Sequence, residues 1–131
     1  MKQTETNTAE IILHDEGYVA FRYKAGVVVD LKAARDDHEA SIKLTNSEPH
    51  PTIVDARGLK RVSYEARVFQ GREEIKNKIT AAAIIVGSLI TKVITNLYVT
   101  FQKPKFPIKT FSNEKDAMKW LSAFINKKDN R

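Results

Sequence analysis

The stretch TAAAIIV at residues 80–86 contains no charged side chain and is followed by Gly87. An apolar run of this length that ends at a turn residue is typical of a strand buried on both faces of a sheet. It is far shorter than the ~20 residues that a membrane-spanning helix needs. The sequence therefore predicts a central strand at residues 80–86.

Downstream, Ser88 is a typical N-cap for a helix, and the strand Ile108–Phe111 begins after Pro107, as edge strands often do. The last helix opens at Ser112 and Asn113. The large apolar residues after Ser88 recur at helical spacing, at Leu89, Ile90, Val93, Ile94, Leu97, Tyr98 and Phe101. The last helix has an inner stripe of Ala117, Trp120, Leu121 and Phe124.

Upstream, Ser63 caps a predicted helix that runs to about Lys76 and is interrupted at Gly71. A short apolar strand is expected at Thr52–Asp55. Residues 46–51 and 57–62 on either side of this strand are expected to be loops.

Two short apolar runs open the chain, at Ala9–Leu13 and Tyr18–Tyr23, around a turn that contains Gly17. This pattern predicts a β-hairpin. Val27–Val29 either extends the second strand or leads into the helix that follows. That helix begins after the N-cap Asp30, runs to about Leu44, and has an inner face of Leu31, Ala34, His38 and Ile42.

The predicted order is thus β-β-α-β-α-β-α-β-α, which indicates an α/β fold: a single, mainly parallel sheet with an N-terminal antiparallel hairpin. The 131 residues fit one domain, expected at 9–125, with a disordered tail at 1–8 and a charged tail at 126–131.

Composition narrows the classes of function. The chain has no cysteine, which excludes disulfides, thiolate metal sites and cysteine nucleophiles. Its first residues lack the apolar core of a signal peptide, so we expect a cytoplasmic protein without a membrane span. The net charge is +6, made up of −2 over residues 1–65 (nine basic, eleven acidic) and +8 over residues 66–131 (thirteen basic, five acidic). The basic residues are dispersed, which is more typical of a solvated exterior than of a nucleic-acid surface.

Three segments carry a resemblance to a known family. They are the strand and loop Ile53–Leu59, the strand Ala81–Ser88 with its apolar helix, and the closing helix reached through Phe111, Asp116 and Leu121. Together they make residues 10–125 similar to the STAS domain of bacterial anti-sigma-factor antagonists, a SpoIIAA-like fold related to the CRAL-TRIO domain. The resemblance implies an α/β fold and a regulatory role through protein partners.

The phosphorylation motif of that family is missing. STAS antagonists carry Asp-Ser-Ser/Thr-Gly after this strand, whereas the present chain places Ser63 at the aspartate, Tyr64 at the phosphoacceptor and Ala66 at the glycine. The resemblance therefore implies the fold and does not extend to the kinase switch. Ser63 is interpreted as a helix N-cap.

One surface is a candidate for binding an anion or an acidic partner. It follows the carboxyl end of a predicted strand, where open parallel sheets commonly hold ligands. Its residues are Asp55, Arg57, Lys60, Arg61, Ser63, Tyr64 and Arg67. The alternative is a capped helix beside a solvated basic loop, in which Asp55 pairs with an arginine. Leu97, Tyr98 and Phe101 form a second candidate, an apolar surface for a partner or a ligand.

Catalytic and cofactor motifs are absent from the sequence. His38 has Ala34 and Ile42 as its i±4 neighbours, so no second metal ligand shares its helix face, and it is interpreted as a partly buried structural residue. Neither Gly-rich nucleotide-binding pattern occurs. We therefore expect a non-enzymatic binding module without a cofactor, which acts on a protein partner or as a homodimer. The alternative is a carrier or sensor of a small apolar or anionic ligand.

Overall fold

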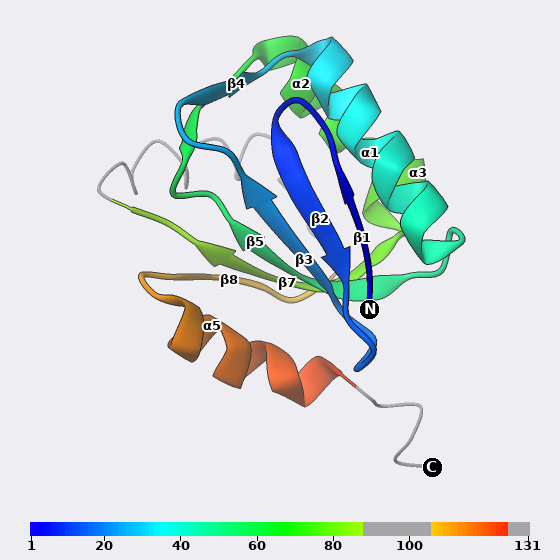
Figure 1. The fold of residues 1–131 in the computed structure, drawn as a ribbon, viewed down its shortest axis with the longest axis vertical. Coiled ribbons are helices and arrows are strands. Elements are labelled where there is room, and N and C mark those ends of the chain that lie inside the picture. The colour runs from blue at the N-terminus through cyan, green and yellow to red at the C-terminus, as the bar shows by residue number, and fades with distance from the viewer. Residues whose placement is uncertain (88–105, 126–131) are drawn as a thin grey trace.

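The computed structural model describes residues 1–87 and 106–125, which form a mixed sheet with helices on both faces (Figure 1). The six strands of the sheet lie in the order β1-β2-β3-β5-β7-β8. Their bounds are β1 Lys2–Glu5, β2 Ala9–Leu13, β3 Val19–Tyr23, β5 His50–Asp55, β7 Ile79–Ile85 and β8 Ile108–Phe111.

The pairing of the strands confirms the predicted mixed sheet. β2 and β3 form the expected antiparallel hairpin, and β3, β5, β7 and β8 are parallel to one another. β7 lies between β5 and β8, as expected for an uncharged strand that is buried on both faces. β8 lies at an edge of the sheet, as expected for a strand that follows proline.

The helices begin at the predicted caps. Asp30 caps α1 (Leu31–Thr45) by accepting a hydrogen bond from the Ala33 N–H, and Ser63 caps α2 (Tyr64–Gln70) in the same way from Ala66. Asn113 accepts from the Asp116 N–H at the start of α5 (Glu114–Leu121), which leads into the short 3-10 helix η1 (Ser122–Phe124). In Figure 1, α1, α2 and α3 (Glu73–Lys76) lie on one face of the sheet and α5 lies on the other.

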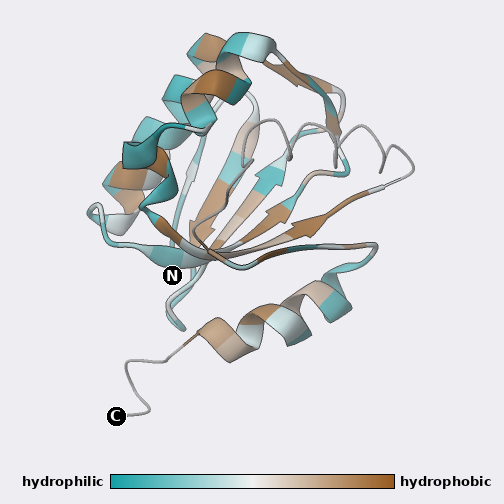
Figure 2. Ribbon diagram, turned by 180° about the vertical axis from the view of Figure 1, so that it is seen from behind, coloured by the Kyte–Doolittle hydropathy of each residue, from teal (hydrophilic) through white to brown (hydrophobic). Residues whose placement is uncertain are grey.

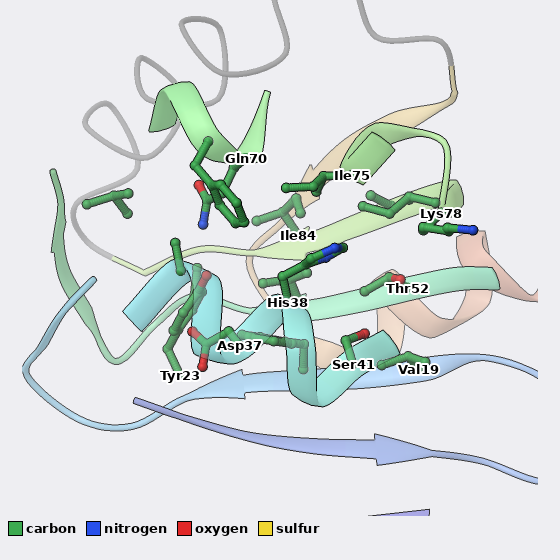
Figure 3. Close-up of a pocket in the computed structure, with 18 of the residues that line it drawn as sticks. Val19, Tyr23, Asp37, His38, Ser41, Thr52, Gln70, Ile75, Lys78 and Ile84 are labelled. Atoms are coloured by element: carbon green, nitrogen blue, oxygen red, sulfur yellow. The ribbon is translucent and has the colours of Figure 1, made fainter. Parts of the chain in front are cut away.

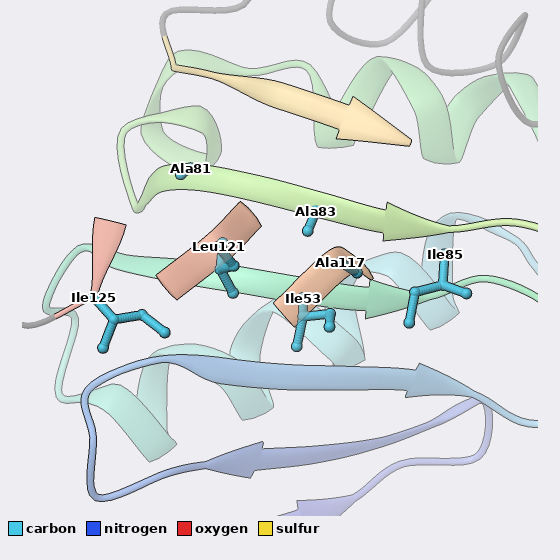
Figure 4. Packing of buried hydrophobic residues seen from close by; sticks show 7 residues of the cluster. All are labelled: Ile53, Ala81, Ala83, Ile85, Ala117, Leu121 and Ile125. Atoms are coloured by element: carbon cyan, nitrogen blue, oxygen red, sulfur yellow. The ribbon is translucent and has the colours of Figure 1, made fainter. Parts of the chain in front are cut away.

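The α5 face of the sheet holds a continuous apolar core (Figure 4). Leu121 and Ala117 of α5 are fully buried against alternate residues of the two central parallel strands. Figure 4 shows these side chains meeting between α5 and the sheet, at Ile53, Ala81, Ala83, Ile85, Ala117, Leu121 and Ile125. The small alanines of β7 allow the helix to approach closely.

The prediction of a disordered tail at residues 1–8 is wrong. Lys2–Glu5 forms the edge strand β1, antiparallel to β2, although its polar sequence has no strand-like alternation of apolar residues. The turn that follows is anchored to α1, because the Thr6 hydroxyl donates to Asp37 Oδ1 at 2.6 Å and the Thr8 hydroxyl donates to Asp37 Oδ2 at 2.9 Å. Tertiary hydrogen bonds, not local pattern, order this segment.

Two predicted loops also contain strands. Leu59–Val62 is strand β6, which pairs in parallel with β4 (Val27–Val29) as a separate two-stranded sheet. β5 begins at His50, two residues before its predicted start, so Pro51 lies inside a strand at an irregular register. The predicted helix from Ser63 to Lys76 is divided at Gly71 into α2 and α3.

Asp37 makes stability depend on pH. Burial raises the pKa of Asp37 above the 3.8 of an unfolded chain, although the Thr6 and Thr8 hydroxyls partly oppose the shift. Folding therefore favours the protonated form, and the stabilisation is fully present below pH 3.8 and is lost as the pH rises through the folded-state pKa. Urea denaturation from pH 3 to 7 should show the stability of the wild type, relative to Asp37→Asn, falling with pH. A constant or rising difference would contradict this.

Candidate functional site

The predicted anion or partner surface is built on β6 and the start of α2. Tyr64 and Val68 lie one turn apart on α2, and their side chains are 63% and 49% exposed. Val28 of β4, 36% exposed, pairs with Arg61 of β6, so both side chains leave the small sheet on the same side. We call Val28, Lys60, Arg61, Tyr64 and Val68 the α2 surface.

Asp55 and Arg57 of the predicted set bind each other. The Arg57 guanidinium donates from Nε to Asp55 Oδ1 at 2.9 Å and from Nη2 to Oδ2 at 2.7 Å, which is a bidentate pair. These hydrogen bonds, together with the arginine charge, lower the pKa of Asp55. Arg57 is therefore engaged within the protein, and the pair closes the end of β5, as the alternative interpretation predicts.

Ser63 and Arg67 have structural contacts as well. The Ser63 hydroxyl oxygen accepts from the Ala66 N–H at 3.1 Å, which is the N-cap role. Arg67 Nη1 donates to the Val62 carbonyl at 2.8 Å, and its guanidinium carbon lies 5.9 Å from the centre of the Tyr64 ring. Of the seven predicted residues, Lys60, Arg61 and Tyr64 are thus the ones whose side chains are exposed and have no structural hydrogen bond to a described residue.

The structure contains a cavity that sequence reasoning missed. It has a volume of about 200 Å³ and lies between the sheet and helices α1 to α3 (Figure 3). Its floor consists of the side chains that point away from α5: Val19, Phe21, Thr52, Val54, Ala82, Ile84 and Ile108. Because side chains alternate between the two faces of a strand, the sequence could have identified the floor residues of β5 and β7. The depth of the space above them depends on how the helices cross the sheet.

The polar side chains of the cavity include two histidines, one on β5 and one on α1. His50 and Thr52 of β5 are buried and paired, with Thr52 Oγ1 2.9 Å from His50 Nδ1. His38 of α1 is half-buried, as predicted, and its ring meets the Phe69 ring edge to face at 5.9 Å. Burial lowers the pKa of both His38 and His50, so both imidazoles are neutral at pH 7.

The cavity is mainly apolar in its chemistry. Tyr23 is partly buried, and desolvation raises the pKa of its hydroxyl far above the usual value. Figure 2 shows that apolar residues recur along the strands that form the floor of the cavity. Among the described residues, no three His, Asp or Glu side chains are grouped to hold a metal ion, and no helix is both long and apolar enough to span a membrane. The predicted apolar surface of Leu97, Tyr98 and Phe101 lies outside the described residues.

Comparisons with known proteins agree with this architecture. An uncharacterised protein of the DUF3478 family with a SpoIIAA-like fold, from Shewanella loihica PV-4, superposes with a TM-score of 0.64 at 17% sequence identity. The match covers 90% of this chain and 98% of the Shewanella protein. At this identity the likeness establishes the fold, and it confirms the predicted STAS-like architecture. No curated protein matches the sequence.

A family model matches residues 11–125, from the second strand of the sheet to the end of η1. The match includes both the α2 surface and the cavity. The chain therefore belongs to the DUF7793 family, described as a domain of unknown function.

Proposed function

We propose that this chain is a non-catalytic module that binds another protein through the α2 surface. One observation carries the proposal. Within residues 1–87 and 106–125, the exposed large apolar side chains are Met1, Val28, Tyr64 and Val68, and all but the terminal Met1 belong to the α2 surface. The segments that carry these residues are neighbours, because the Ser63 N–H donates to the Val29 carbonyl at 2.9 Å and Val28 pairs with Arg61. Exposed apolar residues on neighbouring elements are typical of an interaction site. An exposed tyrosine is also the kind of side chain that most often dominates binding energy.

The charges on the α2 surface favour an acidic partner. Arg61 lies opposite Val28 in the small sheet and Lys60 precedes it on β6, and neither makes an ion pair with a described residue. A two-fold symmetric dimer would bring this surface against its own copy, so that the basic side chains of the two chains would face each other. A different protein with an apolar depression bordered by carboxylates matches the surface better.

The α2 surface can be tested with a double variant, Tyr64→Ser/Val68→Ser. A photo-reactive residue at position 60 would first identify the partner in cells of the natural source, and calorimetry with the two purified proteins would then measure affinity. The double variant is expected to lower the affinity by roughly 100-fold, because two central contacts are removed. The matched control is Glu39→Ser/Lys43→Ser, an exposed pair with the same spacing on α1, which should leave the affinity unchanged.

Two results would contradict the proposal. One is unchanged affinity in the Tyr64→Ser/Val68→Ser variant, with its fold verified by circular dichroism. The other is a concentration-dependent dimer in sedimentation that this variant abolishes, since that would identify a second copy of the chain as the occupant of the α2 surface.

A further inference from the structure

The cavity described above is separate from the α2 surface and has features of a small-molecule site. Figure 3 shows its walls converging from α1, α2, α3 and the sheet, with Thr52 and Ile84 on the floor and His38 and Ser41 on the α1 side. Side chains from elements far apart in sequence therefore line one partly open space.

The volume of the cavity limits what it can hold. An engineered apolar cavity of about 150 Å³ in another protein binds benzene. A space of about 200 Å³ is thus large enough to bury one aromatic ring or two small fused rings, and too small to bury a long lipid chain completely. The cavity is open where small residues line it: Ala34 on the α1 side and Ala82 on the sheet side are both buried, and larger side chains there would fill the space.

The lining favours an aromatic ligand without a charge. Phe21 and Tyr23 meet edge to face at 5.0 Å, and Phe69 meets His38 in the same way, so ring faces and edges line the space. The charged groups of the lining are engaged within the protein. The carboxylate of Asp37 accepts from Thr6 and Thr8, Lys78 Nζ donates to the Ser47 carbonyl at 2.9 Å, and Arg67 Nη1 donates to the Val62 carbonyl at 2.8 Å. Burying an unpaired ligand charge among these groups would therefore be unfavourable.

The ring nitrogens of His38 are available to hydrogen-bond a ligand, as far as the described residues are concerned. A neutral imidazole has one donor and one acceptor nitrogen, and neither ring nitrogen of His38 bonds to a described residue. His50, in contrast, has its Nδ1 engaged by Thr52. A ligand N–H or O–H would find its acceptor in the unprotonated nitrogen of His38.

We propose that this cavity binds a neutral aromatic compound of one or two rings, whose single N–H or O–H donates a hydrogen bond to His38. The aromatic body of the ligand lies on the apolar floor, over Val54, Ala82 and Ile84. This is a binding activity separate from the protein partnership proposed above.

Indole is a suitable probe, with indene as its isostere without the N–H and benzoate as a charged ring of similar size. Methyl NMR on the full chain should show indole shifting the resonances of Val54 and Ile84. Calorimetry should show indole binding about tenfold more tightly than indene, which corresponds to one hydrogen bond. In His38→Phe, which keeps a planar ring but has no ring nitrogen, that preference should disappear. Benzoate should bind more weakly than indole.

A cavity-filling variant tests the location. Ala82→Leu adds three carbons to the floor and should lower indole affinity by at least ~10-fold without lowering the melting temperature, because the added carbons occupy existing space. The matched control is Ala123→Leu on the exposed side of η1, which should bind indole normally.

Three results would overturn the proposal. The first is the absence of shifts at Val54 and Ile84 with millimolar indole, a measurement on the unmodified protein that does not depend on any variant folding. The second is normal indole affinity in Ala82→Leu. The third is tighter binding of benzoate than of indole, which would show that the site selects an anion.

Discussion

Leu121→Ala is expected to lower the free energy of unfolding by about 3 kcal/mol, because large-to-small substitutions in a packed core lose both transfer energy and cavity-lining contacts. The Leu121 side chain is completely buried, and it packs where α5 meets Ile53, Ala83 and Ile125. α5 packs against β5, β7 and β8 with only eight residues. A single leucine thus makes up much of the contact that holds this helix in place.

Chemical denaturation monitored by Trp120 fluorescence would measure this loss, since Trp120 lies on the same helix. Lys115→Ala, on the exposed side of α5, is the control and should change stability by less than about 0.5 kcal/mol. A loss below about 1 kcal/mol for Leu121→Ala would show that α5 does not pack as described.

Gly58→Ala is expected to destabilise the protein by about 2 kcal/mol. A Cβ atom at position 58 would lie 2.8 Å from the Tyr23 carbonyl oxygen and 2.7 Å from that of Lys24. These are backbone atoms, which cannot turn aside as the end of a side chain can. The Gly58 carbonyl also accepts a 2.7 Å hydrogen bond from the Gly26 N–H, so the clash would strain the contact that aligns β4 with β6.

Gly87→Ala is the matched control for that substitution. Its added Cβ would lie 3.7 Å from Arg57 Cγ, which is ordinary van der Waals contact. Thermal unfolding of the two variants should therefore differ clearly, with Gly87→Ala close to the wild type. Equal melting temperatures would indicate that the turns after β3 and β5 do not approach as closely as the structure shows.

Disruption at Gly58 would have a functional consequence as well. β4 and β6 form the base on which Val28 and Arg61 are presented, and α2 begins directly after β6. We therefore expect Gly58→Ala to weaken partner binding at the α2 surface by displacing its residues. Indole binding should decrease less, because the cavity floor belongs to the six-stranded sheet.

Local chemistry made the caps and the central strands predictable. Asp30, Ser63 and Asn113 were recognised because a short polar side chain satisfies a free N–H only one turn into the helix. The strand at residues 80–86 was recognised because an uncharged run needs burial on both faces, and β7 is observed at Ile79–Ile85 between two other strands. Interactions between neighbours in sequence decide such features.

Features that depend on distant partners could not be predicted in the same way. Lys2–Glu5 is polar and becomes a strand only because the free edge of β2 offers backbone groups to pair with. The sequence predicts a loop where β6 is observed, because the four residues Leu59–Val62 find their partner β4 more than thirty positions earlier.

The candidate sites divide along the same line. Short-range spacing is enough to predict the fold class, the helix starts, and the nearness of Tyr64 to the basic residues of β6. The tertiary structure alone decided that Arg57 is engaged by Asp55, that Val68 and Val28 are exposed beside Tyr64, and that His38 faces a cavity. The physical reason is that exposure and enclosed volume depend on how whole elements pack together, and no local pattern of residues specifies that packing.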